Sequence, residues 1–84
     1  MKPIRITPHA RLRSQARGAT EEEVLRAIRE GIPESAKKGR ALYRLNIEFN
    51  AEWMGEKYAV KQVVPVVAEQ ADELVVVTVY VFYF

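Results

Sequence analysis

Residues 74–84 read LVVVTVYVFYF, an uncharged run that is rich in Val, Tyr and Phe. Residues of these β-branched and aromatic types favour strands. Because both faces of this strand are apolar, we expect it in the middle of a sheet. A chain of this length has too few helices to cover both faces, and large exposed apolar patches are rare on monomers. We therefore expect a second copy of the chain, in a homodimer, or a partner chain to cover one face or edge of the sheet.

The segments before this run alternate in polarity. The apolar positions of residues 40–50 share one face and are Ala41, Tyr43, Leu45, Ile47 and Phe49. This period of two predicts a half-buried antiparallel strand. Residues 58–69 form the next expected strand, in which Pro65 indicates a sheet edge or a bulge. Together with residues 74–84, these segments predict a meander.

A loop over residues 51–57 is expected to join the first two of these strands, with Gly55 in its turn. Trp53 and Met54 lie in this loop. If they are exposed, they form a contact point for a partner. If they are tucked under the sheet, they form a satellite core, and this second arrangement is the one that we expect.

The first helix is expected over residues 8–17. Thr7 is a typical N-cap, and Pro8 fits the first helical position, where its missing N–H costs nothing. Gly18 fits the position just after the end of the helix. These three residues therefore bound the helix on both sides.

The second helix begins at a capping box, in which the Thr20 hydroxyl accepts from the Glu23 N–H and the Glu23 carboxylate reaches back. We expect it to run to Glu30 and to stop at Gly31. At the start of the chain, residues 4–6 alternate in polarity after a proline, which predicts a short edge strand.

These elements predict the order β-α-α-β-β-β. The expected fold class is α+β, with two N-terminal helices packed on an antiparallel sheet. A chain of 84 residues fits one domain, over residues 1–84, and leaves no room for two.

Composition excludes several classes of protein. The chain is 49% hydrophobic and 29% charged, so we expect a globular domain rather than disorder. The absence of Cys excludes disulfides and thiolate catalysis, and a single His excludes multi-His metal sites. No P-loop, dinucleotide-binding motif or nucleophile elbow is present, so we expect neither a metal nor a cofactor. Without a membrane-spanning stretch or a secretory signal, the expected location is the cytoplasm, with no membrane partner.

The net charge of +2 hides an uneven distribution. Residues 1–44 carry eleven basic and five acidic side chains, a net charge of +6, whereas residues 45–84 carry two basic and six acidic ones, a net charge of −4. Such asymmetry is typical of a basic surface for a polyanion. The alternative is that the two halves simply attract each other in the fold.

The first helix carries the densest polar group of the chain. His9, Arg13 and Arg17 are spaced by four residues and line one face, while Leu12 and Ala16 mark the side expected to face the core. Arginine binds phosphate bidentately, and histidine exchanges a proton near neutral pH. The group could therefore supply the base and the cations for attack by an RNA 2′-hydroxyl on its phosphate. The alternative is a structural histidine beside a solvated row of arginines.

A second basic group follows, and it consists of Lys37, Lys38, Arg40 and Arg44. It marks a turn and the start of a strand, where it either contacts nucleic acid or is an ordinary solvated surface. Tyr43 lies on the opposite, apolar face of that strand. Tyr80 and Tyr83 are candidates for a catalytic acid or a phosphate contact. In an apolar strand, however, tyrosine is more often a core residue with a satisfied hydroxyl.

Several short motifs resemble a small uncharacterised bacterial family. The motifs are Thr7-Pro8-His9-Ala10 with Arg13, Arg17 and Gly18, then Glu21-Glu22-Glu23-Val24, Gly39-Arg40, and VVVTVY over residues 75–80. Members of the family open with a T-x-H-A-x-x-R-x-x-x-R-G helix and finish on a VVVTVY-like strand, so the resemblance covers nearly the whole chain. That family is similar to BrnT and, more distantly, to the RelE and ParE toxins of toxin–antitoxin modules.

The resemblance implies an α+β fold with helices packed on an antiparallel sheet. It also implies cleavage of mRNA, free or on the ribosome, and inhibition by a small antitoxin protein. RelE-type nucleases place basic and tyrosine side chains on the C-terminal half of the sheet, whereas residues 62–84 contain no Lys, Arg or His. Cationic groups for RNA must then come from the first helix and from residues 37–44.

Two functions follow from the sequence as hypotheses. The first is a metal-independent endoribonuclease of a toxin–antitoxin module, in which His9, Arg13, Arg17 and Tyr80 act in catalysis and the basic group of residues 37–44 binds RNA. The alternative is a non-catalytic interaction module, whose apolar sheet dimerises or binds a partner by strand addition. RNA binding without cleavage is a third hypothesis, so whether the chain is an enzyme stays open at this point.

Overall fold

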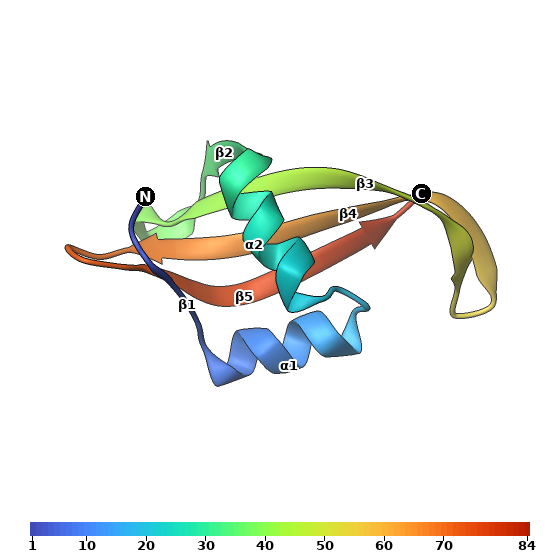
Figure 1. The fold of residues 1–84 in the computed structure, drawn as a ribbon, viewed down its shortest axis with the longest axis horizontal. Coiled ribbons are helices and arrows are strands. Elements are labelled where there is room, and N and C mark those ends of the chain that lie inside the picture. Colours follow the sequence, from blue (N-terminus) through green and yellow to red (C-terminus); the bar gives the residue numbers. More distant parts are fainter.

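The chain folds in the expected order, with one strand more than predicted. The computed structural model describes residues 1–84. Its elements are β1 (Ile4–Ile6), α1 (Pro8–Ala16), α2 (Glu21–Glu30), β2 (Ile32–Ser35), the 3₁₀ turn η1 (Lys37–Gly39), β3 (Ala41–Trp53), β4 (Glu56–Glu69) and β5 (Leu74–Tyr83) (Figure 1). The additional strand is β2, which follows α2 directly and pairs with the start of β3. The predicted α+β class is confirmed.

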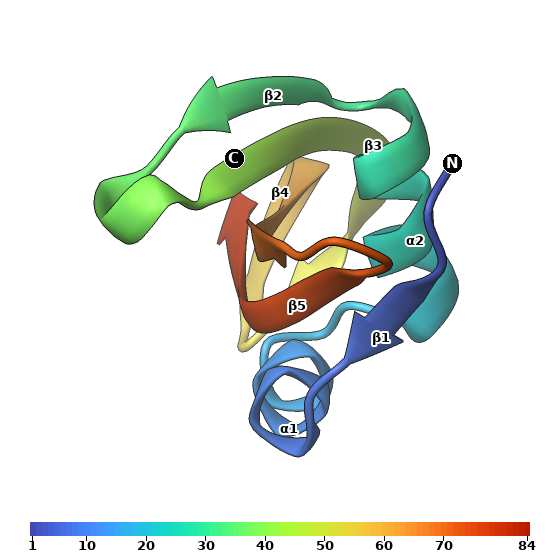
Figure 2. The same ribbon diagram turned by 90° about the vertical axis from the view of Figure 1, so that its left-hand side faces the viewer.

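The five strands form one sheet in the order β1-β5-β4-β3-β2. The strands β2 to β5 are antiparallel, as predicted, but β1 pairs with β5 in parallel, so the sheet is mixed. The predicted edge position of β1 is confirmed. β5 is an interior strand, although the central position belongs to β4 rather than to β5. Figure 2 shows that the sheet is strongly curved.

Pro65 lies in β4, at the centre of the sheet, so its predicted edge position is wrong. The predicted bulge is present: the β4–β5 register shifts by one residue between Val66, which faces Thr78, and Val67, which faces Val76. The pairing of β3 with β4 is also interrupted opposite Pro65, because proline has no N–H to donate. The sheet thus accommodates a central proline by a gap in one ladder and a bulge beside it.

Both helices begin at the predicted N-caps. The Thr7 hydroxyl accepts from the Ala10 N–H at 3.1 Å. At the start of α2, the Glu23 N–H donates to the Thr20 hydroxyl at 3.1 Å, and the Thr20 N–H donates to the Glu23 carboxylate at 2.9 Å. The capping box is therefore complete, and both interactions stabilise the helix start.

The turn between the helices depends on a left-handed glycine. Gly18 has a φ of +84° just beyond the end of α1. Its N–H donates to Gln15 O at 3.2 Å, and the Ala19 N–H donates to Ser14 O at 2.8 Å. This pair of bonds is a Schellman motif, and the predicted role of Gly18 is confirmed.

The inward face of α1 differs from the predicted one. Leu12 is 67% exposed, and Ala16 is exposed as well. The buried residues of α1 are the small Ala10 and Ser14. Small side chains let the helix backbone approach β5 closely, whereas a leucine on that side would hold it away.

The two helices take different places on the sheet. Figure 1 shows α2 lying across one face, while α1 runs beside β5. The core lies under α2, where Val24, Ala27 and Ile28 meet buried valines of the sheet, which are Val63, Val67, Val76 and Val79. We call the opposite face of the sheet the outer face. Neither helix has the length and apolar character needed to cross a bilayer.

Candidate nucleic-acid interface

Three aromatic side chains follow β5 on the outer face. Val79 and Val81 pack toward the core, so Tyr80, Phe82 and Phe84 point to the other side. These three side chains are 45%, 47% and 56% exposed. Successive rings are two residues apart, which is about 7 Å along a strand. We call the three residues the aromatic stripe, and it is the apolar surface that the long uncharged run predicted.

α1 is tied to the edge of β5 at both of its ends. The N–H and the hydroxyl of Thr7 donate to Val76 O at 3.2 and 3.0 Å. The Arg17 guanidinium donates to Val79 O at 2.7 Å and lies over the Tyr80 ring, 5.2 Å from its centroid. A covering helix is one way in which proteins protect a sheet edge. Arg17 also reaches past this edge and brings a cation to the start of the aromatic stripe.

His9 and Arg13 continue the line of Arg17 along α1. Both side chains are exposed, as expected for one polar face of the helix. Neither Arg13 nor Arg17 has a carboxylate within 4.0 Å, although seven ion pairs occupy other cations. The positive charge of this face is therefore not neutralised by the protein. The structure brings Arg17 and Tyr80 together and leaves His9 and Arg13 on the adjoining surface.

Ion pairs within the fold neutralise part of the charge asymmetry of the sequence. Two ion pairs join a base of residues 1–44 to an acid of residues 45–84, and they are Lys2–Glu69 and Arg5–Glu73. Mutual attraction of the halves, the alternative to a polyanion surface, is therefore real for these pairs. It does not account for the unpaired arginines of α1.

The second basic group does not join α1. Lys37 and Lys38 are exposed in η1, and Arg40 is half-buried without a carboxylate partner. Arg44 is already paired with Glu34, at 2.7 Å. η1 and α1 lie apart in both ribbon views (Figures 1 and 2). The predicted cations thus occupy two regions, and of the α1 cations Arg17 lies directly over a ring of the aromatic stripe.

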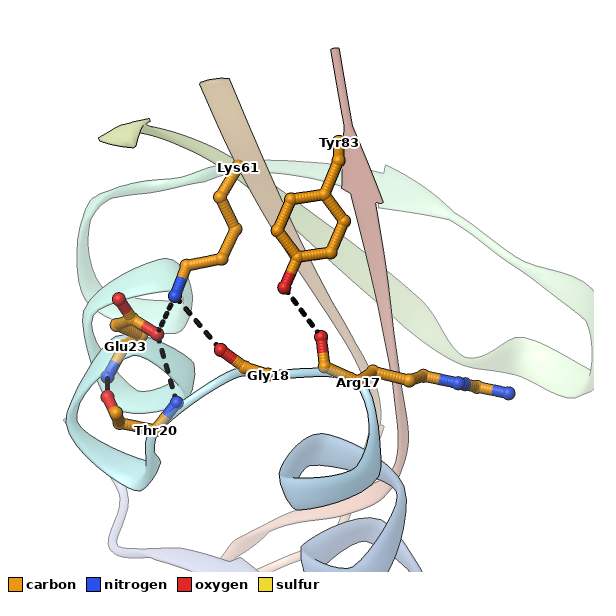
Figure 3. A network of polar contacts seen from close by, with 6 residues as sticks. All are labelled: Arg17, Gly18, Thr20, Glu23, Lys61 and Tyr83. Atoms are coloured by element: carbon orange, nitrogen blue, oxygen red, sulfur yellow. Dashed lines mark hydrogen bonds and ion pairs between the residues drawn. The ribbon is translucent and has the colours of Figure 1, made fainter. Parts of the chain in front are cut away.

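A buried ion pair lies on the helix side of the sheet and was not predicted from the sequence. Lys61 is only 6% exposed. Its ammonium group donates to the Glu23 carboxylate at 2.8 Å and to Gly18 O at 3.0 Å (Figure 3). The same Glu23 oxygen closes the capping box with Thr20. One lysine of β4 therefore holds both the turn between the helices and the start of α2.

Tyr83 secures the same turn from β5. Its hydroxyl donates to Arg17 O at 2.7 Å, which confirms the expected satisfied hydroxyl for Tyr83. The same expectation is wrong for Tyr80, which is 45% exposed. Trp53 stacks on the Tyr83 ring, with centroids 5.1 Å apart. The expected satellite core is therefore confirmed for Trp53, whereas Met54 is exposed at the tip of the hairpin. Figure 3 shows the Arg17 side chain pointing away from this network, so one residue links the buried turn to the outer surface.

The network shifts the pKa values of two of its members. Burial of the Glu23 carboxylate raises its pKa, but hydrogen bonds from Lys61 and Thr20 and the charge of Lys61 lower it more. The pKa of Glu23 therefore lies below its usual value of 4.5. Burial, helped by the nearby charge of Glu23, raises the pKa of the Tyr83 hydroxyl. The ion pair and the neutral tyrosine are thus the stable forms near neutral pH.

A signal for this network exists in the sequence. Lys61 shares its strand parity with Val63, Pro65 and Val67, all on the side that alternation would bury. A single charge at such a position needs a buried partner of opposite sign, because an unpaired charge is too costly to bury. The capping box supplied that partner, Glu23, but its second role was not anticipated.

The surface near the stripe is open rather than enclosed. The larger hollow, of about 400 Å³, lies by the helix turn between Arg11 and Glu21. The smaller one lies on the hairpin by Asn50 and Tyr58. Neither of them includes His9, Arg13 or the aromatic stripe, and no three His, Asp or Glu side chains gather as ligands for a metal. An extended, flexible ligand suits such a surface better than a small molecule does.

Comparison with protein families identifies the chain. The model of a domain of unknown function, DUF4258, matches residues 6–81, so the chain belongs to this family. Membership of an uncharacterised family, which the sequence motifs predicted, is thereby confirmed. A search of curated proteins and a search of solved structures each found no match. The similarity to BrnT, RelE and ParE stays a prediction.

Proposed function

We propose that this DUF4258 domain binds single-stranded RNA across the aromatic stripe and the basic face of α1. The observation that carries the proposal is the position of Arg17, which has no carboxylate partner and lies over the Tyr80 ring. Exposed aromatic rings stack on bases, while neighbouring arginines neutralise phosphates. Other RNA-binding domains use aromatic side chains on one face of a sheet in this way.

The geometry favours a single strand over a duplex. Bases can stack on protein rings only where they are not already stacked and paired within a double helix. The rings of the stripe stand about 7 Å apart, a distance that an extended strand can follow. Arg13 and Arg17 lie on one side of the stripe, where they are available to the sugar–phosphate backbone of that strand. Cytoplasmic RNA is the source of the ligand that we expect.

The same surface supports a second proposal, cleavage of the bound RNA without a metal. His9 is exposed on the face of α1 that carries Arg13 and Arg17. Its imidazole would take the proton of a 2′-hydroxyl, whose oxygen then attacks the adjacent phosphorus to form a 2′,3′-cyclic phosphate. The arginines would stabilise the charge on the phosphate, and the Tyr80 hydroxyl would protonate the leaving 5′-oxygen. This is the chemistry expected of a toxin nuclease, whose antitoxin would cover the same face.

Phe82→Ala is expected to weaken binding of a single-stranded RNA oligonucleotide by about tenfold, because it removes one stacking platform. Fluorescence anisotropy with a labelled decamer of mixed sequence, at fixed salt concentration, measures the effect. Arg13→Gln should weaken binding too, and should reduce the slope of log K against log salt concentration by about 0.7. A DNA decamer of the same sequence shows how much of the affinity depends on the 2′-hydroxyl.

Leu12→Ala is the matched control for these variants. Leu12 is a large exposed apolar residue on the side of α1 that faces away from the sheet, so its loss should leave RNA affinity unchanged. Light scattering on wild type and Phe82→Ala tests the competing occupant, a second copy of the chain or an antitoxin. A dimer that dissociates on substitution of Phe82, with no change in RNA affinity, would show that this face is a protein interface and that the proposal is wrong.

His9→Ala is expected to reduce cleavage of a labelled RNA by about a hundredfold or more while leaving its affinity within about twofold, because a general base contributes to rate rather than to binding. The assay contains EDTA, and products are resolved on a denaturing gel. Gln15→Ala, on another side of α1, serves as the control. Cleavage at the wild-type rate by His9→Ala would remove His9 from the mechanism. Binding without any cleavage by wild type would leave RNA binding alone as the function.

A further inference from the structure

A row of polar side chains crosses the outer face beside the aromatic stripe. Arg44 donates through Nε to Glu34 at 2.7 Å and through Nη1 to Gln62 at 3.1 Å. Gln62 in turn donates through Nε2 to Asn46 at 2.8 Å. The row runs from β2 across β3 to β4, and each of its side chains is held by a neighbour. We call Glu34, Arg44, Gln62 and Asn46 the amide row.

The strand register places this row against the middle ring of the stripe. Asn46 faces Gln62 across β3 and β4, and Gln62 faces Phe82 across β4 and β5. Directly opposed residues share a face of the sheet, with Cβ atoms about 5 Å apart. A base stacked on Phe82 therefore has its hydrogen-bonding edge within reach of Gln62 and Asn46.

Arg44 determines which way the Gln62 amide points. A guanidinium group only donates, so the atom of Gln62 that it contacts must be the oxygen, and the amide nitrogen then points to Asn46. Each amide keeps an N–H and an oxygen lone pair free after these contacts. A side-chain amide with both groups free pairs in bidentate fashion with the adjacent donor and acceptor of adenine.

We infer that Gln62 and Asn46 form a base-reading subsite that prefers adenine on the ring of Phe82. The inference rests on the proposed binding of RNA and adds sequence preference to it. Arg44 is a positioning residue in this subsite, since Glu34 holds it and it holds Gln62. The stripe and α1 supply affinity for any single strand, whereas the amide row distinguishes one base from another.

Binding of the four homopolymeric RNA decamers by wild type and Gln62→Leu tests this inference. Wild type is expected to bind the adenine decamer about tenfold more tightly than the cytosine decamer. Gln62→Leu keeps a side chain of similar bulk but removes the amide, so the two affinities should then agree within about twofold, with binding of the cytosine decamer unchanged. Thr78→Val, which removes a polar group from the same face of β5 outside the amide row, should retain the preference. Thermal unfolding verifies that both variants are folded.

The outcomes separate this inference from the proposed function. If wild type binds no decamer, the proposed function itself is wrong. If wild type binds all four decamers equally, or keeps its preference in Gln62→Leu, RNA binding stands and the subsite is refuted. A preference for another base that Gln62→Leu abolishes would refute the assignment of adenine.

Discussion

Glu23→Gln is expected to lower the free energy of unfolding by about 3 to 5 kcal/mol, because it leaves a buried ammonium group without its counter-charge. Lys61 is almost fully buried, and beside the Phe49 ring its remaining hydrogen-bond partner is a single backbone oxygen, Gly18 O. Glutamine still suits the third position of a capping box, so the variant removes the charge while keeping the cap. Urea denaturation followed by circular dichroism measures the change.

A control and a double-mutant cycle show whether the loss comes from the ion pair. Glu30→Gln removes a carboxylate from the same helix that is paired with Arg26 in an exposed pair, and it should change stability by less than about 0.5 kcal/mol. Lys61→Met should also destabilise the fold, because it leaves the Glu23 carboxylate unpaired. The double variant has neither charge and should cost less than the two single changes together. Additive effects would contradict the coupling that the structure shows.

The same ion pair makes stability depend on pH in the acid range. The folded-state pKa of Glu23 lies below its usual value of 4.5, so its contribution is fully present above that pH. The contribution is lost as the pH falls through the folded-state value, where the carboxylate takes up a proton. Glu23→Gln should therefore flatten the stability profile below about pH 4.5 relative to wild type.

Gly18→Ala is expected to destabilise the protein by about 2 to 5 kcal/mol through two separate effects. The φ of +84° is strained for any residue with a Cβ. A Cβ at this position would also meet the Tyr83 hydroxyl and the Trp53 ring, 2.8 Å from the nearest ring carbon. Because Trp53 stacks on Tyr83 there, its fluorescence and the near-UV circular dichroism should change together with the denaturation midpoint.

Gly55→Ala separates these two effects. Gly55 has nearly the same φ, +86°, but open space where a Cβ would point. Its substitution should therefore cost only the conformational part, about 1 to 2 kcal/mol. The difference between the two variants measures the steric part at Gly18. Equal losses in both would mean that the packing of Tyr83 and Trp53 against the turn contributes nothing.

The elements that follow from local chemistry could be predicted, and those that follow from long-range pairing could not. Caps and turn glycines mark both helices, and polarity alternation marks β3, so these are read directly from the sequence. β2 was missed because its four residues, all exposed, form a strand only by pairing with β3. The prediction of the inward face of α1 was wrong because Ala10 and Ser14 are buried for their small size, which allows close approach to β5, and not for their hydrophobicity.

The candidate site shows the same division. The cationic face of α1 is evident from a spacing of four residues, and an apolar sheet face from the uncharged run of residues 74–84, although Tyr80 was expected in the core. Arg17 lies over Tyr80 only because α1 runs along β5, and no local sequence pattern predicts that arrangement. The ion pair of Arg44 with Glu34 was missed for a similar reason, since Glu34 becomes its neighbour only when β2 pairs with β3.

The single-residue bulge in β5 sets the phase of everything that follows it in the chain. Val76 and Val79 both point inward although they are three positions apart, so the alternation changes phase between them. If the alternation ran unbroken through Val77, Tyr80 and Phe82 would point toward the helices instead. The bulge therefore keeps these aromatic side chains on the outer face. One inserted residue thus shifts the inside–outside alternation once. As a result, the same uncharged strand contributes valines to the core and aromatic rings to the outer face.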